Sequence, residues 1–77
     1  MSLIEDLADG LSRDTYEAML AHGDDRLHER VAKAIGALSP SLEEAFLTSM
    51  RLRLAEQRGR QFLALELSRL KASAETR

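Results

Sequence analysis

The stretch SLEEAFLTSMRLRLAEQRGRQFLALELSRLKAS, from Ser41 to Ser73, decides the fold of this chain. It contains no proline and consists almost entirely of good helix formers, and its apolar residues recur at helical rather than strand spacing. We therefore predict one long helix over 41–73, against which the shorter upstream segments pack.

Two apolar lines run along this predicted helix when its residues are placed at intervals of about 100°. One line comprises Leu42, Phe46, Leu47, Met50 and Leu54. The other begins at Leu52, Ala55 and Gly59 and continues through Leu63, Leu67 and Leu70. Either the helix bends near Gly59, or it is continuous and has one line on its own chain and the other on a partner. Glu56 precedes Arg60 by four residues, an ion-pair order that favours the continuous helix.

A short helix is predicted over residues 2–9, at the start of the chain. Ser2 and Glu5 have the spacing of a capping box, in which each side chain accepts from the other residue's backbone N–H. The dipeptide Asp9-Gly10 is expected to end this helix, because glycine commonly terminates helices.

The next segment, 14–38, begins with a second capping box, Asp14 with Glu17. It is either one helix or two helices broken near Gly23, where glycine would end the first and Asp24 would cap the second. The sequence leaves both alternatives open.

Ser39-Pro40-Ser41 is the clearest turn in the sequence. Proline ends the preceding helix but is favoured in the first turn of the next, with Ser39 or Ser41 as its cap. A connection this short makes the two flanking helices antiparallel neighbours. The predicted fold is all-α: a small antiparallel helical hairpin with a short N-terminal helix and a long C-terminal helix, forming a single domain over 1–77.

Composition indicates that this fold is completed by oligomerisation or by a partner. At 77 residues a single chain buries a thin core, and the absence of cysteine removes disulfides and thiolate zinc sites as supplements. No apolar run approaches the length of a membrane span, and the start MSLIEDLADG lacks the basic region of a signal peptide. We expect a cytoplasmic protein with no membrane contact.

Charge is distributed unevenly along the chain. Up to Glu29, eight acidic residues and two arginines give a formal charge of −6, whereas nine basic and five acidic residues after it give +4. The simplest interpretation is that the acidic half folds against the basic half. The asymmetry also suits head-to-tail assembly of copies.

The chain has no pattern typical of an enzyme, a metal site or a cofactor site. His22 and His28 are six residues apart and fall on different sides of a helix, so they do not form a ligand pair. Ser39 and Ser41 have a sufficient role as helix caps, and no motif places a base beside them. We predict no catalytic residues, no metal and no cofactor.

The second apolar line is therefore the feature that indicates function. Either the N-terminal helix covers it through Leu3, Leu7 and Leu11, or it is an exposed face for another copy or another protein. Our leading hypothesis is a non-catalytic protein-interaction module of the adaptor, chaperone or inhibitor type, with flanking arginines for orientation. The predicted partner-binding residues are Leu52, Phe62, Leu63, Leu67, Leu70, Arg51 and Arg58.

Nucleic-acid binding is the alternative. Two rows of basic residues follow the long helix and are spaced to contact phosphates. They comprise Arg51, Arg58 and Arg69 on one side and Arg53, Arg60 and Lys71 on the other. The sequence pI near 5.6 and the lack of aromatic residues between the arginines argue against this function.

Overall fold

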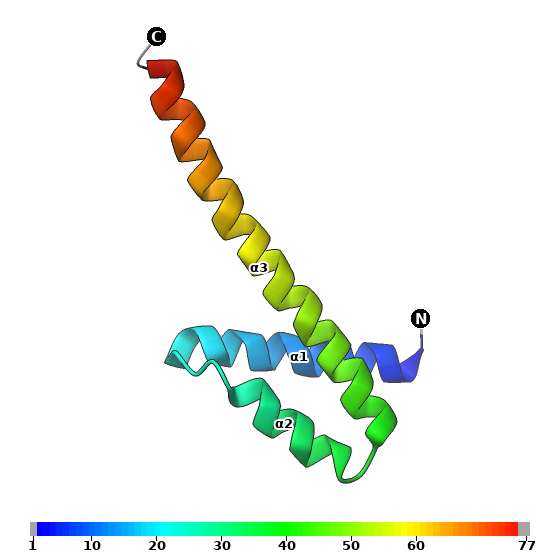
Figure 1. The fold of residues 1–77 in the computed structure, drawn as a ribbon. Coiled ribbons are helices and arrows are strands. Elements are labelled where there is room, and N and C mark those ends of the chain that lie inside the picture. Colours follow the sequence, from blue (N-terminus) through cyan, green and yellow to red (C-terminus); the bar gives the residue numbers. More distant parts are fainter. Residues whose placement is uncertain (1, 76–77) are drawn as a thin grey trace.

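The computed structural model describes residues 2–75, which form three helices and no strand (Figure 1). They are α1 (Leu3–His22), α2 (Leu27–Gly36) and α3 (Pro40–Glu75). The prediction of an all-α fold is confirmed. The described chain measures 60 × 29 × 14 Å, and α3 extends well beyond the other two helices.

Helix α1 is longer than predicted, and the expected stop at Asp9-Gly10 is wrong. Ser2 caps the helix as expected, because its hydroxyl accepts from the backbone N–H of Glu5 at 3.2 Å. The helix then continues through Gly10 and through Asp14, where a new helix was predicted to begin. Tertiary packing explains the difference, since α1 buries one face against α3, and this burial offsets the cost of about 1 kcal/mol for a helical glycine. The buried face consists of Ala8, Ser12, Thr15 and Met19.

Gly23 separates α1 from α2. Its φ of 65° is left-handed, a conformation that favours glycine, and its N–H bonds to the carbonyl of Met19. Asp24 does not cap α2 as anticipated; its carboxylate instead accepts from the backbone N–H of Arg26 at 3.1 Å and pairs with the guanidinium of Arg30. These two hydrogen bonds, that from Arg30 being the stronger influence, hold the pKa of Asp24 below 3.8.

The connection between α2 and α3 spans residues 37–39. Ser39 caps α3, because its hydroxyl accepts from the backbone N–H of Leu42 at 3.1 Å, and Pro40 is the first helical residue. Helix α3 runs back from this turn past both α2 and α1 (Figure 1). It is one continuous helix through Gly59, and the predicted ion pair between Glu56 and Arg60 forms at 2.6 Å.

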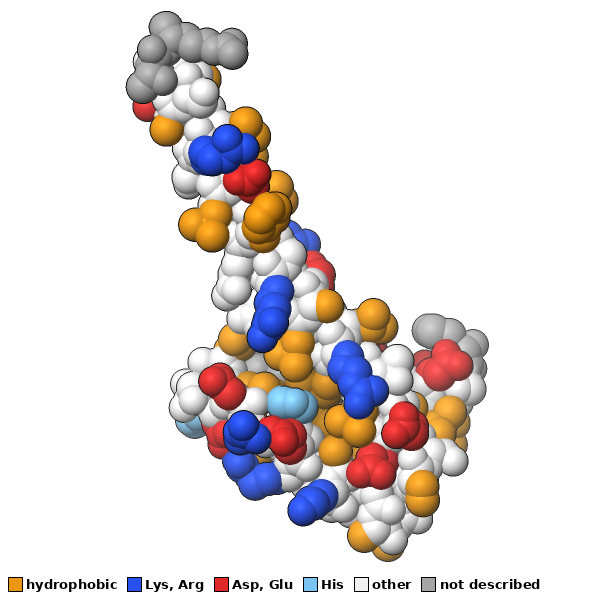
Figure 2. Space-filling view, in the orientation of Figure 1, with side chains coloured by type: hydrophobic (Ala, Val, Ile, Leu, Met, Phe, Trp, Pro, Cys, Tyr) orange, Lys and Arg blue, Asp and Glu red, His pale blue; other side chains and the backbone are white. Residues whose placement is uncertain are grey.

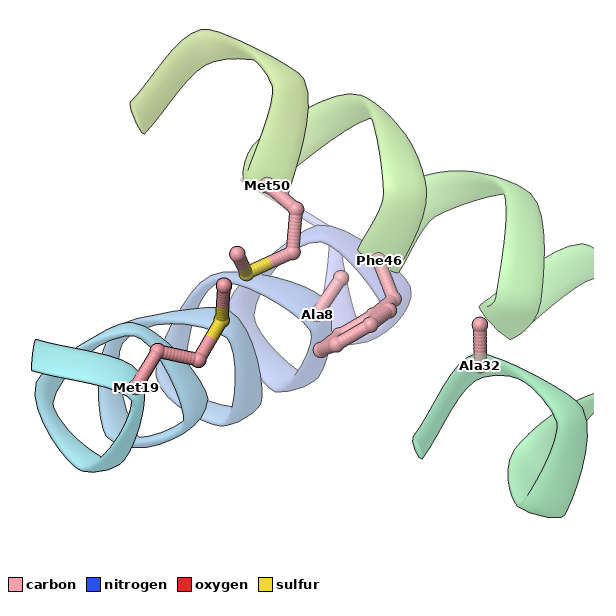
Figure 3. Close-up of a cluster of buried hydrophobic side chains, with 5 residues drawn as sticks. All are labelled: Ala8, Met19, Ala32, Phe46 and Met50. Carbon is pink, nitrogen blue, oxygen red and sulfur yellow. The ribbon is translucent and has the colours of Figure 1, made fainter. Parts of the chain in front are cut away.

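The core lies where the three helices meet. Phe46 and Met50 of α3 are completely buried, and Met19 of α1 points toward Met50 (Figure 3). Ala8 and Ala32 complete the cluster and let the helices approach closely. Helix α1 packs more extensively against α3 than α2 does, so the N-terminal helix is the main partner of the long helix and not a short appendage to a hairpin.

A polar network also joins α1 to α3. Ser12 is fully buried, lies 2.6 Å from the hydroxyl of Ser49, and donates to the carbonyl of Asp9 at 3.0 Å. The Ser49 hydroxyl must therefore be the donor between the two serines. Arg53 donates to the Ser12 oxygen at 3.0 Å and to the carboxylate of Asp9 at 2.6 Å. The buried hydroxyl thus has all its hydrogen bonds, which fixes how α1 lies on α3.

Candidate partner-binding surface

Within residues 2–75, no other part of the chain covers the C-terminal half of α3. Residues 58–75 span about 27 Å of helix, and every one of them except the half-buried Glu66 is exposed. Figure 2 shows this part of the helix, with hydrophobic side chains along it, projecting from the body, by which we mean α1, α2 and the first half of α3. Local interactions support it, since Glu56 pairs with Arg60 at 2.6 Å and Glu66 with Arg69 at 3.0 Å.

Four of the predicted binding residues lie on one side of α3, and we call them the leucine stripe. At 100° per residue they occupy a sector about 60° wide. They are Leu52, Leu63, Leu67 and Leu70, whose exposed fractions are 68%, 53%, 47% and 55%. Gly59 falls on the same side, in the gap between the first and second leucines. Phe62 is also exposed, at 66%, but lies about 100° away from the centre of the stripe.

The leucine stripe faces away from the core. Its centre lies about 120° around the helix from the fully buried Phe46 and Met50. Along the core-facing side, the helix beyond the body carries polar residues such as Gln61 and Ser68. A helix of this length with two separate apolar sectors about 120° apart can contact α1 and α2 with one and a second molecule with the other.

The N-terminal helix does not cover this stripe, which settles one alternative left open by the sequence. Leu3 and Leu7 are themselves exposed, at 73% and 53%, and Leu11 packs against the core. All four leucines of the stripe therefore remain accessible from solvent.

Arg51 and Arg58 lie elsewhere than predicted. They do not flank the leucine stripe but lie about 120–140° from its centre, where both line an open groove of about 610 Å³ between α1, the start of α2 and α3. Neither arginine forms an ion pair within residues 2–75. The groove thus carries two arginines on α3, together with the carboxylate of Asp25 near the start of α2.

The floor of the groove contains residues that the sequence analysis did not assign to a site. Tyr16, Leu20 and His28 line it together with Leu54. Leu20 is 58% exposed. The buried Nδ1 atom of His28 has no hydrogen-bond partner among residues 2–75. The spacing of Tyr16 and Leu20 on one side of α1 was the available signal, but only the angle between α1 and α3 shows that this side is open.

The remaining basic residues of α3 are mostly paired with acids of the same chain. Arg53 bonds to Asp9 across α1 and α3, and Arg60 and Arg69 bond to neighbouring glutamates. Within residues 2–75, no group of three or more histidine, aspartate or glutamate side chains is arranged to hold a metal ion. In the same part of the chain, no helix has the length and apolar character needed to cross a membrane.

Comparison with known proteins adds no assignment to this geometry: no protein-family model, curated protein or solved structure matches the chain.

Proposed function

We propose that this chain is a small, non-catalytic protein-interaction module of the adaptor or chaperone type, in which the body holds α3 and the leucine stripe binds another protein molecule. The observation that carries the proposal is the uncovered stripe itself. Leucines that are 47–68% exposed lie on one side of a projecting helix, with Glu56 and Gly59 between Leu52 and Leu63. Exposed apolar surfaces of this kind on soluble domains usually mark interaction sites.

The division of labour along α3 supports this proposal. Its first half supplies the core residues Phe46 and Met50, and its second half contributes nothing to the core. A bare helix presenting apolar residues at intervals of three and four matches the common mode in which an amphipathic helix face binds another helix or a groove. We also propose that α2 and α3 form an antiparallel hairpin and that the protein is cytoplasmic.

The test replaces two leucines of the stripe with glutamate, as Leu63→Glu and Leu67→Glu in one variant. A matched control, Gln61→Glu with Ser68→Glu, adds the same charge to the opposite side of the same helix segment. We expect the first variant to lose association, measured by light scattering and by recovery of bound protein from host extract, and the control to retain it. Equal behaviour of the two variants would refute the proposal, as would association that persists in both.

A second candidate function, nucleic-acid association, is favoured by Arg51 and Arg58, which form no ion pair with any other residue of the described range 2–75. Three of the six basic residues in the predicted rows are neutralised by neighbouring acids, which weakens a phosphate-tracking surface. This function predicts salt-sensitive retardation of duplex DNA that is lost in an Arg51→Ala, Arg58→Ala variant. No retardation by wild-type protein at low salt would exclude it.

A further inference from the structure

We infer that the occupant of the leucine stripe is a second copy of this chain, with the two α3 helices antiparallel and related by a two-fold axis that passes beside Leu63. This inference rests on the proposed function and gives it a specific partner. Three features of the described residues carry it: the spacing along the stripe, the position of Gly59, and the charges at the two ends of the stripe.

The spacing along this side of α3 is the same in both directions. The successive positions are Leu52, Glu56, Gly59, Leu63, Leu67, Leu70 and Ala74, separated by 4, 3, 4, 4, 3 and 4 residues. An isologous two-fold contact requires a surface that is complementary to itself after rotation. Reversal about Leu63 leaves Leu63 in place and superposes the other six positions in pairs: Leu67 with Gly59, Leu70 with Glu56, and Ala74 with Leu52.

Residue sizes also match in the antiparallel arrangement. The two-fold axis sets Leu63 against Leu63 of the second copy and Leu67 against Gly59 of the second copy. A Cβ added to Gly59 would meet nothing within 4 Å, so the position offers open space for a leucine. A parallel pair would instead set Gly59 against Gly59 and leave a gap, and would bring the two Glu56 carboxylates together.

Charges at the two ends of the stripe are complementary in the same arrangement. A hollow of about 400 Å³ adjoins the start of the stripe and is lined by Glu5 and Asp9 of α1 together with Leu52 of α3. The antiparallel pairing brings the C-terminal part of the second α3, with Lys71, to this hollow, where Asp9 is already paired with Arg53 and Glu5 is the remaining acid. Within residues 2–75 neither Glu5 nor Lys71 forms an ion pair. The pairing therefore brings the Lys71 ammonium of one copy toward the Glu5 carboxylate of the other.

The size of the contact sets the expected strength. From residue 52 to residue 74 the stripe is about 33 Å long. A contact of this length and a width of about 10 Å buries roughly 700 Å² over both copies, which is less than the roughly 1,200 Å² of stable specific interfaces and fits a weak, transient contact. We therefore expect a dimer that dissociates on dilution, with a dissociation constant of about micromolar order.

The experiment uses single cysteines, since the full chain contains none. Leu63→Cys lies at the two-fold axis and should form a disulfide-linked dimer in high yield under mild oxidation. Leu70→Cys should not, because its two copies are about 21 Å apart along an antiparallel pair. Gln61→Cys, on the opposite side of the helix, controls for random collision. Helicity of each variant is checked before oxidation.

Each pattern of crosslinking has a distinct meaning. Efficient linkage of Leu63→Cys alone supports the antiparallel dimer, whereas equal linkage at positions 63 and 70 indicates a parallel pair and overturns it. A wild-type chain that stays monomeric at about 100 μM, which is about 100-fold above micromolar concentration, also overturns the antiparallel dimer. If the wild-type chain is monomeric, the Leu63→Glu, Leu67→Glu variant separates the proposed function from the proposed dimer. Loss of binding to a different protein in this variant would mean that only the identity of the partner was wrong. If no association depends on the leucine stripe, the proposed function fails too.

Discussion

Replacing Leu63 and Leu67 by alanine in one variant gives the strongest quantitative prediction. Each change removes three carbon atoms, worth about 0.8 kcal/mol apiece on full burial. The two side chains are 53% and 47% exposed in the single chain, so about half of this value is gained only on association. Each position thus loses about 1.2 kcal/mol per copy, and two positions in two copies lose about 5 kcal/mol. The dimer dissociation constant should rise by about three to four orders of magnitude.

The stability of the single chain should respond differently. Neither leucine belongs to the hydrophobic core or packs against it, and alanine is at least as good a helix former as leucine. Thermal unfolding at a protein concentration low enough to keep both proteins monomeric should therefore agree within about 0.5 kcal/mol. Association is measured by sedimentation across a dilution series, and helicity by circular dichroism on the same samples.

The control for this variant is Gln61→Ala with Ser68→Ala, which shortens two side chains on the opposite side of the same segment. We expect its dissociation constant to stay near that of the wild type. A loss of monomer stability by several kcal/mol in the leucine variant would show that these residues belong to a core, and the reasoning from their exposure would be refuted. An unchanged dissociation constant would refute the interface instead.

Three further predictions concern the body. Phe46→Ala should cost about 3–5 kcal/mol of unfolding free energy because Phe46 is fully buried, whereas Phe62→Ala, at a 66% exposed site, should cost about 0.5 kcal/mol or less. Denaturant melts at concentrations that keep both variants monomeric measure the two costs. Equal costs would contradict the described core. Gly10→Ala should stabilise the chain by about 0.5–1 kcal/mol because Gly10 is helical with open space at its Cβ position. Gly23→Ala should destabilise it by about 1–2 kcal/mol because the φ of Gly23 is left-handed. Stability changes of the same sign in both variants would be inconsistent with a continuous α1. The carboxylate of Asp24 has a folded-state pKa below its ordinary 3.8, so its contribution to stability is complete above pH 3.8 and is lost as the pH falls through the lowered pKa. Asp24→Asn should therefore be less stable than wild type at neutral pH, and thermal melts below pH 3.8 should show a smaller difference. A stability difference independent of pH would count against the ion pair.

Local chemistry made several parts of this fold predictable from the sequence. The hydroxyl of Ser2 and that of Ser39 cap helices, and Glu56 pairs with Arg60, as their spacing indicated. Each of these interactions spans four residues or fewer, so it depends only on helical geometry. The continuous α3 follows for the same reason, because strong helix formers on both sides of Gly59 offset the cost of one glycine.

Tertiary packing overruled the sequence at Gly10. The face that α1 buries is formed by small and polar residues such as Ala8 and Ser12, which an apolar pattern does not reveal. Ser12 is buried favourably because Ser49, Arg53 and the backbone of Asp9 satisfy its hydroxyl, and two of these partners are distant in sequence. Such burial is visible only once α3 lies against α1.

The candidate surface divides in the same way. The sequence by itself determined that α3 has two apolar lines and that Leu63, Leu67 and Leu70 share one of them, because helical periodicity fixes which residues face together. Only the tertiary structure decided that α1 and α2 occupy the other line, that the leucine stripe is left uncovered, and that Arg51 and Arg58 border a groove instead. The physical reason is that exposure is a property of the packing angles between helices, and those angles are set by contacts between residues far apart in the chain.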